Sequence, residues 1–231
     1  VHPRSLVQQL ILWQLINSNF PLGAYNYSEG LEYLVESAGC SEVESFQDWL
    51  GLHLRYGSIR AEVSIVLRIV QAIASGDFNQ LQYWNTWLNG TRETRELRQQ
   101  SIQMGNSLLK LLGDLDENKR PQLGACREQI GKSCHYAIAF GIAIALWDIE
   151  SHQAVLGYLH SWLSNLVSAG VKLIPLGQTQ GQRIIYQLQP LIIETVETVV
   201  TQKEMDLYAC TWGLSLASMN HETQYTRLFR S

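Results

Sequence analysis

The chain has 231 residues, 46% of them hydrophobic, so it is long and apolar enough to bury a substantial core rather than remain disordered. Seventeen lysines and arginines against 21 aspartates and glutamates give a net charge of -4, which argues against nucleic-acid binding. Four widely spaced cysteines form no Cys-x-x-Cys pair, which excludes a dense disulfide framework and favours reduced, mostly buried thiols at Cys40, Cys126, Cys134 and Cys210.

Neither a secretion signal nor a membrane span is expected. The first residues lack a basic region followed by an apolar block and a cleavage site of small residues. The most apolar stretch, at 134–147, is shorter than the roughly 20 residues that a membrane helix needs. We therefore expect a cytoplasmic protein without membrane association.

Six segments in the first half of the chain carry apolar residues at helical spacing. They lie at about 6–16, 31–38, 41–54, 59–75, 78–88 and 91–112. Two of these segments begin with residue pairs that have the spacing of capping boxes, in which two side chains satisfy the free amides of a helix start. The pairs are Ser41 with Glu44 and Asp77 with Gln80.

Loops are expected where polar residues, proline and glycine interrupt these segments. The first loop covers 17–26 and contains Pro21, which would break a helix. Asn89 and Gly90 are expected to end the fifth helix. The most polar stretch, at 114–121, is short for a linker between domains.

The stretch CHYAIAFGIAIALW at 134–147 has no acidic residue, lysine or arginine, so it is expected to be buried. Small and large residues alternate in it, which is also typical of a buried strand. A helix is favoured because Ala137, Gly141 and Ala145 fall four apart and would let a neighbouring helix approach closely. We expect this helix to be the centre of the core.

Four further helix-length segments follow the apolar stretch. One covers about 155–167 and should end near Gly170 or Pro175, and the others lie at 184–188, 192–200 and 205–216. Alternating strand patterns with hairpin turns are missing from the sequence. The prediction is an all-α fold, in which residues 1–231 form a single domain of roughly ten helices packed around the apolar helix at 134–147.

No sequence motif indicates catalysis. Gly131, Lys132 and Ser133 resemble the end of a phosphate-binding loop, but the earlier glycine is replaced by Cys126 and no strand precedes it. The six histidines show no zinc-site spacing, so we expect no metal site and no cofactor. The alternative is an all-helical small-molecule enzyme or ligand carrier, which would require a closed apolar pocket with convergent polar groups.

The end of the chain has the composition of an interface. In a helix, Tyr225, Leu228 and Phe229 would share one face, flanked by Arg227 and Arg230, and these residue types are enriched at binding hot spots. We predict that 219–231 is a partner-binding tail. The alternative is a tail that packs back on its own domain.

Four stretches together resemble one family, the urease accessory protein UreF. They are NSNFPLGAYNYSEGLE (17–32), ETRELRQQSIQMGNSLL (93–109), HYAIAFGIA (135–143) with NLVSAGVKLIPLGQTQGQR (165–183), and HETQYTRLFRS (221–231). The resemblance covers nearly the whole chain in order. It implies an all-helical, non-catalytic homodimer that bridges UreD (also called UreH) and the GTPase UreG while nickel is delivered to the urease apoprotein.

The resemblance also implies two partner surfaces. The tail would become ordered against UreD, with contacts from His221, Glu222, Tyr225, Arg227, Leu228, Phe229 and Arg230. A second surface, for the GTPase, would lie near Tyr25, Ser28 and Lys172, with Arg230 tying the tail to the N-terminal loop through hydrogen bonds. Lys172 stands among apolar residues, so its ammonium group must either extend to solvent or meet a partner.

Overall fold

The computed structural model describes residues 3–37, 39–208 and 211–231. Within these ranges the chain forms eleven α-helices and no strand, which confirms the all-α prediction. The α-helices are α1 (Pro3–Leu15), α2 (Leu31–Glu36), α3 (Val43–Tyr56), α4 (Ser58–Ser75), α5 (Asn79–Thr91), α6 (Arg95–Leu115), α7 (Arg120–Ile130), α8 (Tyr136–Leu146), α9 (Ser151–Leu173), α10 (Gln178–Thr201) and α11 (Trp212–Glu222). Three short 3-10 helices join them: η1 (Ala24–Asn26), η2 (Glu117–Lys119) and η3 (Glu204–Asp206).

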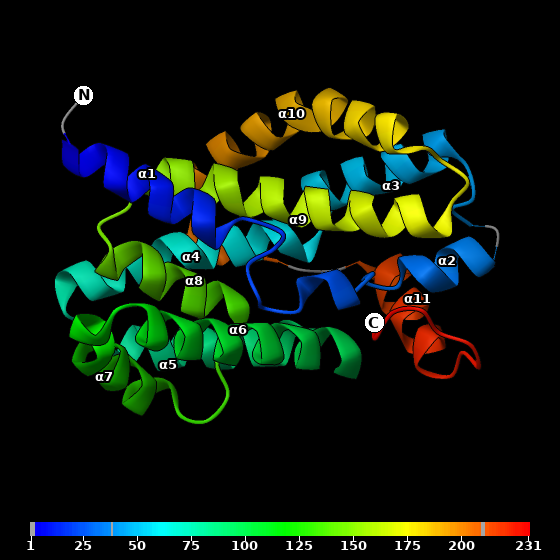
Figure 1. Cartoon of the computed structure of the whole chain (residues 1–231). Helices are drawn as coiled ribbons and strands as arrows, with labels where there is room; N and C mark the ends of the chain where they lie inside the picture. The colour runs from blue at the N-terminus through cyan, green and yellow to red at the C-terminus, as the bar shows by residue number, and fades with distance from the viewer. Residues whose placement is uncertain (1–2, 38, 209–210) are drawn as a thin grey trace.

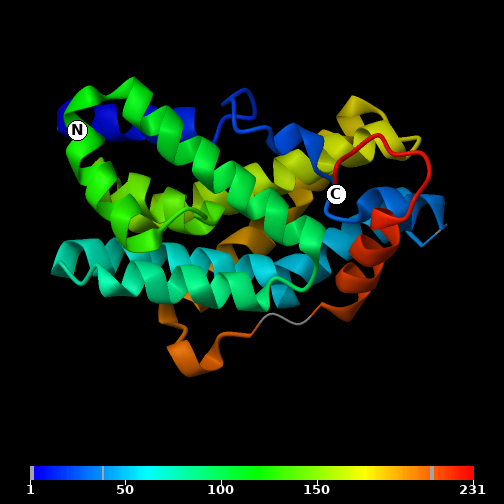
Figure 2. The same ribbon diagram turned by 90° about the horizontal axis from the view of Figure 1, so that it is seen from below.

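The long helices are stacked in layers (Figure 1). Helices α10 and α9 lie on one side, α4 and α8 in the middle, and α5, α6 and α7 on the other side. Helices α2 and α11 gather with the end of the chain toward one end of the molecule, opposite the start of α1 (Figure 2). The C-terminal residues are therefore placed beside the segment that leads into α2.

Helix α8 corresponds to the apolar stretch and is buried without interruption from Ala137 to Ile144. It packs most extensively against α4. A Cβ atom on Gly141 would lie only 2.7 Å from the Cβ atom of Ile69 and 3.1 Å from the carbonyl oxygen of Val66, both on α4. The small residue thus permits the close helix contact, as its spacing predicted.

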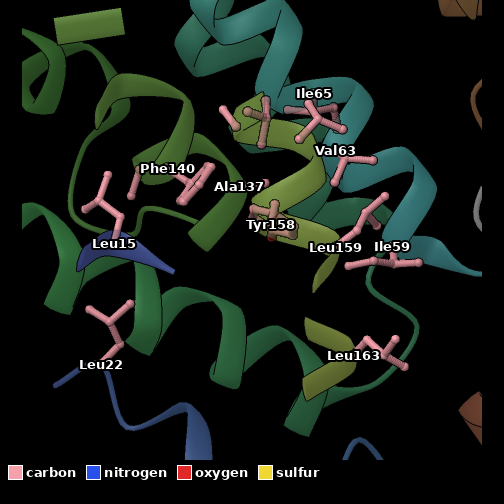
Figure 3. Close-up of a cluster of buried hydrophobic side chains, with 14 of the residues drawn as sticks. Leu15, Leu22, Ile59, Val63, Ile65, Ala137, Phe140, Tyr158, Leu159 and Leu163 are labelled. Carbon is pink, nitrogen blue, oxygen red and sulfur yellow. The ribbon is translucent and has the colours of Figure 1, made fainter. Parts of the chain in front are cut away.

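The core joins helices that are far apart in sequence. Figure 3 shows part of a buried hydrophobic cluster, to which α1, α4, α8, α9 and the loop after α1 contribute apolar side chains. The labelled members are Leu15, Leu22, Ile59, Val63, Ile65, Ala137, Phe140, Tyr158, Leu159 and Leu163. This packing holds the N-terminal loop against α9, which positions the segment that the C-terminal residues contact.

Neither predicted capping box forms. Helix α3 starts at Val43, two residues after the predicted segment begins, and its capping box pairs Glu42 with Ser45. Helix α5 is preceded by Phe78, which supplies no side-chain cap, and it continues through Asn89 and Gly90. A glycine costs a helix only about 1 kcal/mol, so burial of the apolar face of α5 outweighs it.

The polar loop at 114–121 is much shorter than expected. Only Asp116 separates α6 from η2, and α7 already begins at Arg120. Pro121 therefore lies in the first turn of a helix, where its missing amide costs no hydrogen bond.

The helices predicted near the C-terminus also differ from the structure. The two pieces at 184–188 and 192–200 form one helix, α10, which contains Pro190. Pro190 has no amide hydrogen, so the carbonyl group of Tyr186, four residues earlier, loses its helical hydrogen bond. Both residues are exposed, so water can bond to that carbonyl group. The piece at 205–216 is not one helix, because the described residues Leu207, Tyr208 and Thr211, between η3 and α11, are not helical.

Two residues used in the predictions, Ala38 and Cys210, lie outside the described residues. The other three cysteines are free and buried, as predicted. Every helix in the described part of the chain is too short or too polar to cross a bilayer.

Candidate functional site

The C-terminal segment, defined here as residues 223–231, follows α11 in a non-helical conformation. The prediction that Tyr225, Leu228 and Phe229 share a helical face was therefore wrong. The backbone amides of Leu228 and Phe229 donate to the two carboxylate oxygens of Glu32, at 2.5 and 2.9 Å. Acceptors on the N-terminal part of the chain thus replace the carbonyl groups that a helix would have provided.

The end of this segment is also held by hydrogen bonds. The amide of Arg230 donates to the carbonyl oxygen of Asn26 at 2.8 Å, so the backbone of Arg230 joins the segment to the N-terminal loop. The amide and hydroxyl of Ser28 both donate to the carbonyl oxygen of Ser231, each at 2.6 Å. The hydroxyl of Ser231 in turn donates to Gln100 on α6 at 2.7 Å.

A buried charged cluster lies under the segment. The imidazole of His221 is fully buried, with Nε2 3.2 Å from Glu32 on α2 and Nδ1 2.8 Å from Glu96 on α6. The other carboxylate oxygen of Glu96 accepts from the guanidinium of Arg227 at 2.8 Å. Three helices and the C-terminal segment are therefore joined by four ionisable side chains.

Phe229 is the apolar anchor of the segment, because only 5% of its surface is exposed. The ammonium group of Lys172, at the end of α9, lies 5.5 Å from the centroid of its ring. This is a cation–π distance, so the exposed Lys172 has a partner within its own chain. Nearby, burial raises the pKa of Tyr27, and the guanidinium of Arg230 opposes that rise.

The predicted partner-binding residues fall into two groups. Ser28, His221 and Phe229 are buried, and they hold the segment in place. The others are exposed, and they are Tyr25, Lys172, Glu222, Tyr225, Arg227, Leu228 and Arg230. Tyr225 is fully exposed and Leu228 is 64% exposed, so these two side chains project outward from the anchored segment. The alternative of a tail packed on its own domain describes this arrangement.

Glu32, Glu96 and Gln100 contact the segment, but no sequence pattern indicated these contacts. Glu32 and Phe229 are nearly 200 positions apart, and a single sequence carries no signal that pairs them. An exposed stripe on α11 was also missed. It consists of Trp212, Leu216 and Met219, whose spacing of four and three places them on one helix face.

The structure contains a cavity of about 70 Å³ between the N-terminal loop and helices α4, α6, α8 and α9. Pockets for organic ligands are typically larger, at roughly 300 to 1,000 Å³. The charged groups in its wall are already paired, since Arg92 forms an ion pair with Glu62 and Glu29 accepts from Gln100 and Trp162. This cavity does not favour the alternative of an enzyme or ligand carrier.

Cys134 and His135 are adjacent residues of types that bind soft metals, and both are buried at the start of α8. Burial raises the pKa of the Cys134 thiol to about 12 and lowers the pKa of His135 to about 3. The ring of His135 pairs with the hydroxyl of Ser101 at 3.1 Å. A protonated thiol and a hydrogen-bonded neutral imidazole thus occupy these positions. The described residues contain no cluster of three or more potential metal ligands.

Comparison with known proteins identifies the family. The family model described as UreF matches residues 40–189. The urease accessory protein UreF of Trichormus variabilis is 51% identical over 222 residues, covering 96% of this chain and 95% of that protein. The urease accessory protein UreF of Nostoc sp. is 52% identical over 222 residues, which also cover 96% of this chain and 95% of that protein. The Synechocystis sp. protein of that name is 47% identical over 234 residues, covering 96% and 98%. The chain belongs to the UreF family of urease accessory proteins.

Proposed function

We propose that this protein is a non-catalytic adaptor in urease maturation. It bridges UreD (UreH) and the GTPase UreG in a complex with the urease apoprotein, in which nickel is inserted. Membership of the UreF family and the name shared by its relatives, urease accessory protein, support a role in this process. The small cavity, in which Arg92 is already paired with Glu62, gives no support to the enzyme alternative.

The observation that carries this proposal is that the C-terminal segment contains both anchored residues and outward-facing side chains. Phe229 and the amides of Leu228 and Arg230 are bound to the rest of the chain, whereas the side chains of Tyr225 and Leu228 project outward. A preorganised segment loses less conformational entropy on binding than a free one. An exposed tyrosine and leucine on a fixed backbone suit a hydrophobic pocket of a partner, for which we propose UreD.

The GTPase surface lies beside this segment in our proposal. Tyr25 is exposed on η1, next to Asn26, which accepts the amide of Arg230. Lys172 covers the ring of Phe229, so it belongs to the same neighbourhood. Ser28 is buried, and its proposed contribution is to hold Ser231 rather than to touch a partner. UreG recruitment should therefore depend on Tyr25 and Lys172 directly.

The test is co-purification with UreD of a double variant, Tyr225→Ser with Leu228→Ser. Both side chains point away from the chain, so the circular dichroism spectrum and melting temperature should stay unchanged. We expect UreD to be lost from the purified complex. The matched control is Tyr186→Ser, because Tyr186 is an equally polar and largely exposed tyrosine on α10. Undiminished UreD recovery with the double variant would contradict the tail assignment.

Recruitment of UreG needs its own test. Tyr25→Ala and Lys172→Ala should each reduce the amount of UreG that joins a preformed complex with UreD, while UreD itself stays bound. Full UreG recovery in both variants would contradict the proposed surface.

The proposal also includes self-association and a cytoplasmic location. A homodimer would give twice the 26.2 kDa chain mass in light scattering of the purified protein. Cell fractionation should find the protein with the cytoplasmic urease apoprotein. The isolated chain should convert no substrate, and measurable turnover would favour the enzyme alternative.

A further inference from the structure

The contacts of His221 with Glu32 and Glu96 require a proton on each ring nitrogen of the histidine. Both ring nitrogens of a fully buried histidine face carboxylate oxygens, at 3.2 and 2.8 Å. An ionised carboxylate only accepts hydrogen bonds, so each ring nitrogen must carry a proton to bond with it. Two bonds of this kind require the imidazolium form of His221.

Each carboxylate also accepts bonds from N–H donors other than the ring. Glu32 accepts the amides of Leu228 and Phe229, so both of its oxygens act as acceptors. Glu96 is paired with the guanidinium of Arg227. With His221 protonated, two negative and two positive charges balance. A neutral ring would leave a net negative charge in a buried site and place a lone pair against a carboxylate oxygen.

We propose that this cluster is a proton-controlled latch, in which protonated His221 holds the C-terminal segment in its docked conformation and loss of that proton releases it. Glu32 transmits the effect, because the same carboxylate binds His221 and the amides of Leu228 and Phe229. Release follows a rise in pH. The docking of the segment is a property of the isolated chain, whereas any consequence for UreD binding rests on the proposed function.

The groups that face His221 come from three elements packed against α11. They are Glu32 from α2, Glu96 from α6 and, through Glu96, Arg227 from the C-terminal segment. Other described histidines do not share this setting. Burial lowers the pKa of His53 to about 4 and that of His135 to about 3, so both remain neutral above these values. His152 and His160 are exposed on α9.

Hydrogen exchange of the Leu228 and Phe229 amides in the isolated chain tests the latch. Exchange is measured from about pH 5 to about pH 9, a range that brackets histidine titration in most proteins, and is corrected for the intrinsic rate at each pH. We expect protection of both amides to fall by roughly ten- to a hundredfold as pH rises, in a transition of one proton, because charge-assisted bonds are lost.

Variants assign the transition to the ring. His221→Gln cannot be protonated, so both amides should be weakly protected at every pH. Glu96→Gln keeps His221 and Glu32 but removes one carboxylate, and it should move the transition to lower pH. This second variant serves if the first one unfolds. The matched control, His160→Gln, should behave as the wild type.

Two results would overturn the latch. One is wild-type protection of both amides that does not change with pH, and the other is a wild-type transition that persists in His221→Gln. Exchange is measured on the isolated chain, so this test remains valid even if the segment does not bind UreD. Conversely, failure of the latch would not decide whether the segment binds UreD, which the co-purification experiment tests separately.

Discussion

Replacement of Phe229 by alanine should detach the C-terminal segment while leaving the helical domain folded. Phe229 is the one large side chain of residues 223–231 that is buried, and its ring also contacts the Lys172 ammonium group. Removal of a buried phenylalanine typically costs about 3 to 5 kcal/mol, and loss of an exposed cation–π contact about 0.5 to 1 kcal/mol.

The segment can avoid most of this cost by leaving its site. Residues 223–231 lie at the end of the chain and contribute to no helix, so their release exposes little of the core. A loss of about 3 kcal/mol corresponds to a detached population about a hundredfold larger. The amides of Leu228, Phe229 and Arg230 should therefore exchange roughly a hundredfold faster, with a nearly unchanged melting temperature.

Leu228→Ala is the matched control, because the side chain of Leu228 lies next to Phe229 in sequence but is 64% exposed. It should change exchange at these amides less than about threefold, since it removes little buried surface. Unchanged protection in Phe229→Ala would refute the anchor. A lower melting temperature with the segment still protected would show instead that Phe229 belongs to the main core.

Three further predictions concern the helical domain. Gly141→Ala should lower the free energy of unfolding by about 1 to 3 kcal/mol, because the new methyl group overlaps α4, whereas Gly124→Ala, whose Cβ would meet nothing within 4 Å, should be neutral or stabilising in urea unfolding. Arg92→Ala leaves the buried Glu62 carboxylate without its ion pair and should cost about 3 to 5 kcal/mol in the same assay. His53 has its pKa lowered to about 4 by burial, so below about pH 6.5 the unfolded chain binds a proton that the folded chain does not. The free energy of unfolding should then fall by about 2 kcal/mol per such histidine between pH 7 and pH 5, and His53→Gln should remove about 2 kcal/mol of this fall and leave the part due to His135.

Both proposed partner surfaces of the adaptor depend on the docked C-terminal segment. Tyr25, Lys172 and the outward residues of the C-terminal segment lie around Phe229 and the Asn26 carbonyl, although they come from three separate parts of the sequence. A change in docking of this segment would therefore alter both proposed partner sites together.

Helical periodicity was the strongest information in the sequence. The segments at 41–54 and 91–112 correspond to α3 and α6, each of which buries apolar residues at helical spacing, and Gly141 lies against α4. These features depend on residues three or four positions apart, and a helix brings such neighbours together by its own geometry. The family resemblance rests on similar local stretches.

Helix ends and the C-terminal segment were decided by tertiary contacts. Helix α5 continues through Gly90 because its apolar face is buried. The amides of Leu228, Phe229 and Arg230 bind acceptors on α2 and the N-terminal loop, which holds this part of the segment in a non-helical conformation. Local propensity is worth about 1 kcal/mol or less per residue, and buried contacts exceed it.

The sequence by itself determined an all-helical fold, the burial of the apolar helix α8 and the family to which the chain belongs. Only the tertiary structure brought Glu32, Glu96 and His221 together and divided the C-terminal residues into anchors and outward side chains. The physical reason is distance along the chain. Periodicity reports which face of a helix is buried, whereas the pairing of charges from α2, α6 and α11 depends on how the folded helices pack.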